Sequence, residues 1–288
     1  MADYKPGPIK LQEQDLKGKV AVVTGATKGI GRAITLNLSS RGCSVLGTYS
    51  SPQSAHNFDV LSHTVHDLYR APEAAQHAQG ENAPKMKGVV ADITSLQSTG
   101  TVLGSLEREF GNKLDILVLN VAYNTRPCLG SASEDDVQKS LTANLQWPIV
   151  LMENIARNKL FQPCSRVVVL SSDRVRDPCA GSSIFNATKA GLESLVRSWA
   201  LELPPLFPGT TVNAVSVGLT DTPGLRSLPP ADIEGLKKQR LPKVKVVEGG
   251  RMGYPEDVAD IVGFLVGEKA RWQSGSVVAA NGGAEFLG

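Results

Sequence analysis

Three glycines in one short segment have the spacing of a phosphate-binding turn. The segment TGATKGIG, residues 24–31, follows a short apolar, β-branched run and precedes apolar residues at helical spacing. Gly25 permits a tight turn, Gly29 lets the backbone approach a pyrophosphate, and Gly31 allows a helix to pack closely on a strand. The helix N-terminus would then present free N–H groups to the phosphates. The segment therefore predicts a dinucleotide site.

The end of the second predicted strand favours NADP(H) over NAD(H). An NAD enzyme places Asp or Glu there to bind the ribose diol, whereas this chain has Thr48, Tyr49 and Ser50. No carboxylate would repel a 2′-phosphate at this strand end. Lys28, inside the glycine turn, would attract that phosphate as a point charge. The alternative for Lys28 is an ordinary exposed cation.

A parallel sheet is needed to position these residues. Near-continuous Val, Ile and Leu runs alternate with segments of helical periodicity, as in a parallel sheet covered on both faces. With right-handed crossovers, this pattern predicts an α/β fold, a single-domain, doubly wound parallel sheet of the Rossmann type with helices on both faces. The predicted strands lie at residues 19–24, 42–48, 88–92, 114–120, 166–170, 211–216 and 276–280.

Three segments depart from this alternation. Residues 1–16 are polar and predict an N-terminal arm before one domain of residues 17–288. Residues 71–86 predict a surface loop between the second and third strands. Residues 219–251 follow the carboxyl end of a strand and predict a substrate lid. The basic run within the lid, residues 237–240, is interpreted as a solvated helix face.

Composition argues against several classes of protein. The 288 residues carry a formal net charge of +2 without a long Lys/Arg run, so we expect no nucleic-acid partner. No apolar stretch approaches the roughly 18 residues that span a bilayer, and we expect no membrane partner. Scattered cysteines and the lack of a secretory signal predict a cytoplasmic protein with reduced thiols. His63 and His66 have no further ligands near them in sequence, so we expect no metal.

The chain resembles the short-chain dehydrogenase/reductase family over roughly residues 17–284, in particular NADPH-dependent ketone and 3-oxoacyl reductases. The form TGxxxGIG of the glycine turn is specific to that family. The resemblance also implies a small-molecule substrate and a homodimer or homotetramer. It implies that the cofactor is bound by Gly25, Thr27, Lys28, Gly29, Ile30, Gly31, Tyr49, Ser50, Asp92, Ile93, Asn120, Val121, Ala122, Lys189, Val217, Gly218, Thr220 and Thr222.

The same resemblance implies a proton network of four positions, Asn144, Ser172, Phe185 and Lys189. Ser172 would hydrogen-bond the substrate oxygen, Lys189 would hold the cofactor ribose, and Asn144 would position a water leading to Lys189. The family has a proton-donating tyrosine where this chain has Phe185. Their spacing of four places Phe185 and Lys189 on one helical face.

Phe185 has the ring of tyrosine without its hydroxyl, and three explanations stay open. The first is a laboratory replacement of a natural tyrosine. The second is a natural enzyme with another acid, such as Asp173 or Arg126. The third is a protein that keeps NADP(H) and its pocket for a non-redox task such as cyclisation or scaffolding. Asp173 also has a plainer interpretation, because residues 173–177 can form a local ion-paired loop of little energetic weight.

We therefore expect an NADP(H)-dependent oxidoreductase scaffold. Its reaction would be the reduction of a ketone, or the oxidation of the secondary alcohol, of a mid-sized organic molecule. Since general acid catalysis contributes about 10²–10⁴ in rate, Phe185 would impair that reaction.

Overall fold

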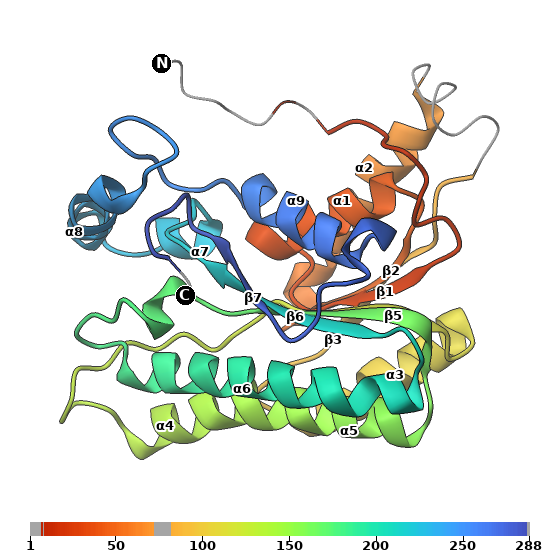
Figure 1. Ribbon diagram of the computed structural model, residues 1–288, viewed down its shortest axis with the longest axis horizontal. Coiled ribbons are helices and arrows are strands. Elements are labelled where there is room, and N and C mark those ends of the chain that lie inside the picture. Colours follow the sequence, from red (N-terminus) through yellow and green to blue (C-terminus); the bar gives the residue numbers. More distant parts are fainter. Residues whose placement is uncertain (1–6, 8, 72–81, 287–288) are drawn as a thin grey trace.

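One parallel sheet forms the centre of the protein. The computed structural model describes residues 7, 9–71 and 82–286. Within them, seven strands pair in the order β3-β2-β1-β4-β5-β6-β7, all parallel (Figure 1). The predicted doubly wound sheet is confirmed. Its strands are β1 (Val20–Val23), β2 (Ser44–Tyr49), β3 (Met86–Val90), β4 (Leu114–Leu119), β5 (Phe161–Leu170), β6 (Thr211–Val217) and β7 (Val277–Ala280).

Helices cover both faces of the sheet (Figure 1). One face carries α1 (Gly29–Ser40), α2 (Ala55–Arg70) and α9 (Pro255–Val266). The other carries α3 (Gln97–Phe110), α5 (Trp147–Arg157) and α6 (Ser183–Leu206). The remaining described α-helices are α4 (Glu134–Leu141), α7 (Pro223–Arg226) and α8 (Pro230–Arg240).

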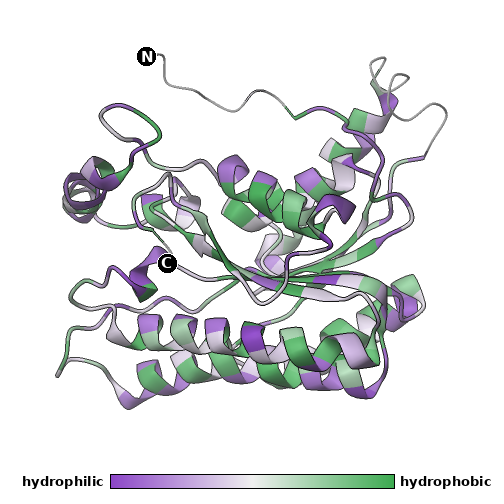
Figure 2. Ribbon diagram, viewed as in Figure 1, coloured by the Kyte–Doolittle hydropathy of each residue, from purple (hydrophilic) through white to green (hydrophobic). Residues whose placement is uncertain are grey.

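Side chains alternate along each strand and so divide the core into two layers. Val22 of β1 belongs to the same buried cluster as Trp147 of α5, while the next residue, Val23, belongs to the cluster that contains Ile34 of α1. Figure 2 shows hydrophobic residues concentrated in the strands and along α1 and α9, and a largely hydrophilic α8. The period of two in a strand produces this division, because successive side chains point to opposite faces.

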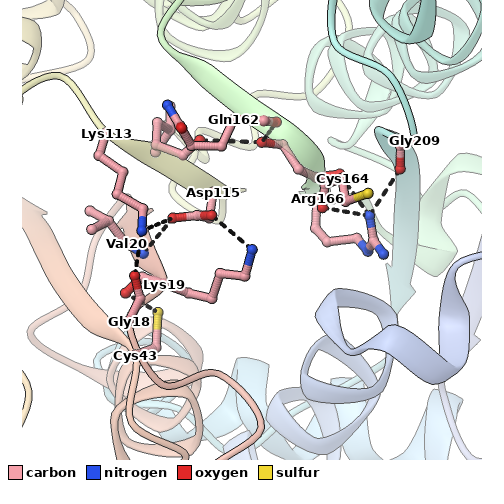
Figure 3. A network of polar contacts seen from close by, with 12 residues as sticks. Gly18, Lys19, Val20, Cys43, Lys113, Asp115, Gln162, Cys164, Arg166 and Gly209 are labelled. Atoms are coloured by element: carbon pink, nitrogen blue, oxygen red, sulfur yellow. Dashed lines mark hydrogen bonds and ion pairs between the residues drawn. The ribbon is translucent and has the colours of Figure 1, made fainter.

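Asp115 anchors the amino edge of the sheet (Figure 3). Its carboxylate is 2% exposed and accepts hydrogen bonds from the backbone N–H of Val20 at 2.9 Å and from Lys19 Nζ at 2.9 Å. The pairing of β4 with β5 is irregular here, between Leu114 and Ile116. The carboxylate thus joins the start of β1 to β4 at this irregularity.

Two segments outside the sheet are the predicted N-terminal arm and the predicted loop of residues 71–86. Residues 9–16 of the predicted arm lie against the end of α1, with Leu11 and Leu16 buried and Gln12 N–H donating to the Ser40 carbonyl at 3.1 Å. Residues 72–81 of the predicted 71–86 loop lie outside the described residues. No described helix is both long and apolar enough to cross a membrane.

The interpretation of the basic run as a solvated helix face holds for Lys238 and Gln239, which are exposed, and is wrong for Arg240. The interpretation of Asp173 as part of a locally paired loop is also wrong. Arg240, expected on a solvated face, is 3% exposed, and its guanidinium forms ion pairs with Asp173 and Asp177. Asp173, expected in a local loop, is also buried and pairs with a partner 67 residues away. Lys243 adds a further ion pair to Asp177 at 2.6 Å. These contacts fasten the end of α8 to the turn after β5.

Replacing Arg240 by Met should destabilise the protein by about 3 kcal/mol, because it leaves the buried carboxylate of Asp173 without its counter-ion. Denaturant unfolding measures this change in the free energy of unfolding. The matched control is Lys238→Ala, since the Lys238 side chain is exposed on the same helix, and we expect a change within about 0.5 kcal/mol. Equal effects of the two substitutions would contradict a stabilising role for the buried ion pairs.

Candidate active site

The site lies where the strand order reverses. The chain runs from β1 towards β3 on one side and from β4 towards β7 on the other, so a crevice opens beyond the carboxyl ends of β1 and β4. Hydrogen bonds join these two ends. Thr24 Oγ1 accepts from the Asn120 backbone N–H at 2.8 Å, and Asn120 Nδ2 donates to the Thr24 carbonyl at 2.8 Å. These hydrogen bonds hold the ends of β1 and β4 together at the base of the crevice.

The glycine turn fits a phosphate group. Gly25 and Gly29 have φ of 69° and 54°, in the left-handed region that favours glycine. A Cβ on Gly31 would lie 2.1 Å from the Gly25 carbonyl oxygen, so no side chain fits there. The residue before α1, Lys28, makes no side-chain cap, and the first N–H groups of the helix stay available to an anion.

The residues expected around the adenosine follow β2 and β3. Tyr49 is buried, with its ring centroid 6.1 Å from that of Phe58, and Ser50 is exposed. Asp92 is exposed and its Oδ1 accepts from the Thr94 N–H at 2.9 Å. Lys28 is exposed, and the ion pairs found among the described residues do not include it. Thr27 and Ile93 are buried, and Val121 is partly buried beside Gly25.

A cavity of about 700 Å³ brings the other predicted residues together. Ser172, Phe185 and Lys189 all line it. It is also lined by Ile30, Asn120, Ala122, Val217, Gly218, Thr220 and Thr222. A Cβ on Gly29 would lie 3.5 Å from the Thr222 side chain, so the start of the predicted lid lies over the glycine turn. The cavity thus joins the glycine turn to the predicted proton network.

Lys189 is an unusual cation because it is buried. Only 3% of it is exposed, and desolvation lowers the pKa of its ammonium group to about 8. The ammonium donates to the Leu170 carbonyl at 2.6 Å. It also lies 5.7 Å from the centroid of the Phe185 ring. The carbonyl at the end of β5 and the ring on α6 therefore hold the charge in place.

Asn144 lies in a π-helical turn, Thr142–Gln146, between α4 and α5. Such π-helical turns are frequent at functional sites. Its side chain accepts from the Tyr123 N–H at 2.7 Å and donates to the Tyr123 carbonyl and to Thr188 Oγ1. The amide therefore fixes the loop after β4 against α6, and the water expected near Lys189 stays a prediction.

Glu193 is a supporting residue that the sequence did not reveal. It is 3% exposed and accepts from Ser171 Oγ at 2.6 Å and from Arg176 Nη2 at 2.7 Å. It follows Lys189 by one helical turn on the same side of α6. That spacing was the available signal, but a glutamate on a helix is usually exposed.

Both alternative acids line the cavity. Burial raises the pKa of the Asp173 carboxyl, while the charges of Arg240 and Arg174 oppose that rise. Arg126 donates from Nε to Asn124 Oδ1 at 3.3 Å. Burial, followed by the charge of Arg174, lowers the pKa of the Arg126 guanidinium.

Comparison with known proteins agrees with this geometry. Residues 25–285 match the family model described as Enoyl-(Acyl carrier protein) reductase. The chain is 30% identical to short-chain dehydrogenase/reductase FrzI of Cladobotryum, over 93% of this chain and 96% of that protein. It is 31% identical to the 3-oxoacyl-[acyl-carrier-protein] reductase FabG of Salmonella typhimurium, over 93% and 97%.

A solved structure extends the likeness to three dimensions. A short chain dehydrogenase from Burkholderia cenocepacia, in complex with NADP, superposes with a TM-score of 0.77 and 31% identity. The match covers 94% of this chain and 99% of the Burkholderia chain. The sequence matches, the sheet order and the shared fold together show that the chain belongs to the short-chain dehydrogenase/reductase family.

Proposed function

We propose that this protein binds NADP(H) and acts as an oxidoreductase on a ketone or the corresponding secondary alcohol. The observation that carries the proposal is the single crevice in which the glycine turn, Ser172 and Lys189 meet. The NADP in the Burkholderia relative supports the choice of cofactor. So does the absence of a carboxylate from Thr48, Tyr49 and Ser50 at the end of β2.

The cofactor, when bound, would supply or accept the hydride. The glycine turn and the N-terminus of α1 would hold its pyrophosphate, and Lys28 its 2′-phosphate. Asp92 and Ile93 would lie at the adenine. Near the nicotinamide we assign positioning roles to Asn120, Ala122, Val217, Gly218, Thr220 and Thr222.

The remaining residues would act on the substrate oxygen. Ser172 Oγ accepts from the Arg174 backbone N–H at 3.2 Å, which leaves its own hydrogen free to donate to a carbonyl oxygen. Lys189 would donate to the ribose and add positive charge to the site. Phe185 occupies the tyrosine position of the family and has no proton to give. Ser172 would therefore polarise the carbonyl, and the proton would reach the alkoxide slowly.

The cofactor assignment predicts tighter binding of NADPH than of NADH. Lys28→Ala should weaken NADPH binding about tenfold and leave NADH binding unchanged, because only NADPH carries the 2′-phosphate. Fluorescence titration measures both dissociation constants. Lys269→Ala is the matched control, since it also removes one exposed lysine. Lys269 follows α9 and is not part of the glycine turn; its neighbour Glu268 pairs with Arg166 of β5. If neither nucleotide binds, the proposed function is wrong.

Restoring the hydroxyl should restore catalysis. We expect Phe185→Tyr to accelerate NADPH-dependent reduction across a panel of ketones by about 10²–10⁴, because it supplies the missing general acid. Phe264→Tyr, which adds a hydroxyl on the half-exposed Phe264 of α9, should have no effect.

Two other outcomes would identify the alternatives. If the unmodified chain is already active and Asp173→Asn abolishes that activity, Asp173 is the acid. Product formation that requires bound cofactor but is equal with NADP and NADPH would instead favour a non-redox reaction such as cyclisation.

A further inference from the structure

The cavity beside Ser172 carries an excess of positive charge. Its lining includes the cations Arg126, Arg174, Lys189 and Arg240 and one carboxylate, Asp173. Arg240 is compensated by its ion pairs with Asp173 and Asp177, and those pairs also occupy the two carboxylates. Among the described residues, no ion pair is formed by either Arg126 or Arg174. Two guanidinium groups, neither of them in a described ion pair, thus line one cavity.

Arg174 is the more deeply placed of the two. It is 7% exposed and follows Ser172 by two residues, and its Nη1 donates to the thiol of Cys179. A guanidinium has five N–H donors, so this contact leaves most of them unused. The described polar atoms that are sealed from solvent without a partner do not include any from Arg174. The unused donors are therefore accessible, and the cavity that this side chain lines is the space available to them.

Arg126 approaches the same space from another loop. A Cβ on Gly181 would lie 2.8 Å from the Arg126 carbonyl oxygen, so the loop after β4 is packed on the loop before α6. The Arg126 side chain contacts Asn124 and no described carboxylate. Both arginines line the same cavity, and burial, followed by the charge of Arg174, lowers the pKa of the Arg126 guanidinium. A bound anion would relieve the repulsion between the two charges.

We propose that Arg126 and Arg174 bind an oxoanion of the substrate, so that the substrate is an acidic ketone or its hydroxy acid. The inference rests on the proposed function, since the reacting oxygen must lie at Ser172 while the anion lies at the two arginines. Arginine suits this role because its planar fork matches carboxylate and phosphate oxygens. The role also differs from proton donation by Arg126, because a guanidinium keeps its proton in proteins.

The test compares matched charged and neutral ketones on the protein saturated with NADPH. Calorimetry would give dissociation constants for levulinate against methyl levulinate, and for dihydroxyacetone phosphate against dihydroxyacetone. We expect the charged member of at least one pair to bind about 10- to 100-fold more tightly, as for hydrogen bonds to charged groups. The preferred pair distinguishes a carboxylate from a phosphate.

Variants then assign the effect to the two arginines. Arg126→Gln and Arg174→Gln should each remove most of the preference for the anion and leave the dissociation constant of the neutral ketone unchanged. Arg174→Lys should retain part of the preference. If Arg174→Gln fails to fold, the exposed Arg126 carries the test. Arg157→Gln is the control, because it also removes a guanidinium. Arg157 lies at the end of α5 that leads into the start of β5, whereas the cavity lies at the other end of that strand.

The two proposals fail in different ways. Loss of NADPH binding would overturn the proposed function. Normal NADPH binding with equal affinity for acid and ester, or with no measurable binding of either anion, would overturn only the anion site.

Discussion

The junction between β1 and β4 is the constraint on which the site depends. Asn120 donates two hydrogen bonds to Thr24 across it, and the same Thr24 hydroxyl also accepts from the Val121 N–H at 3.2 Å. Gly31 packs so closely on Gly25 that no side chain fits between them. With both strand ends fixed, α1 must begin directly over the crevice, and its free N–H groups face whatever lies there. The loops that carry the reacting groups are then built outward from this junction.

The ion pairs of Arg240 connect α8, within the predicted lid, to the turn that follows Ser172. Asp173 follows Ser172 directly, so a change at α8 reaches the reacting residues through one guanidinium. A second cavity of about 630 Å³ shares Asp173, Gly218, Leu219 and Arg240 with the first. These four residues form a wall between the two spaces. Because separating a buried charge from its partner is costly, the ion pair between Arg240 and Asp173 holds α8 against this wall.

In the proposed site, Phe185 stands where the family has a tyrosine hydroxyl, and the neighbouring groups are held in place without it. Lys189 keeps its position through the Leu170 carbonyl and the face of the Phe185 ring, and Glu193 holds Ser171 beside it. Binding and proton transfer are thereby separated, since phenylalanine fills the space of tyrosine without donating a proton. The arginines beside Ser172 give the cavity a charge that the reaction itself does not require. Within the described residues neither arginine forms an ion pair, which is why we propose an anionic substrate.

The sequence by itself determined the sheet, its helices and the glycine turn, because these follow from local periodicity and from backbone conformations that only glycine adopts readily. The resemblance to the short-chain dehydrogenase/reductase family pointed to Ser172, Phe185 and Lys189, and all three line one cavity. Only the tertiary structure decided which charged side chains are buried and which residues they pair with. Arg240 appeared solvated and Asp173 locally paired, since each is ordinary among its sequence neighbours. Their burial depends on a partner 67 residues away, and the energy of a charge is set by what surrounds it in space.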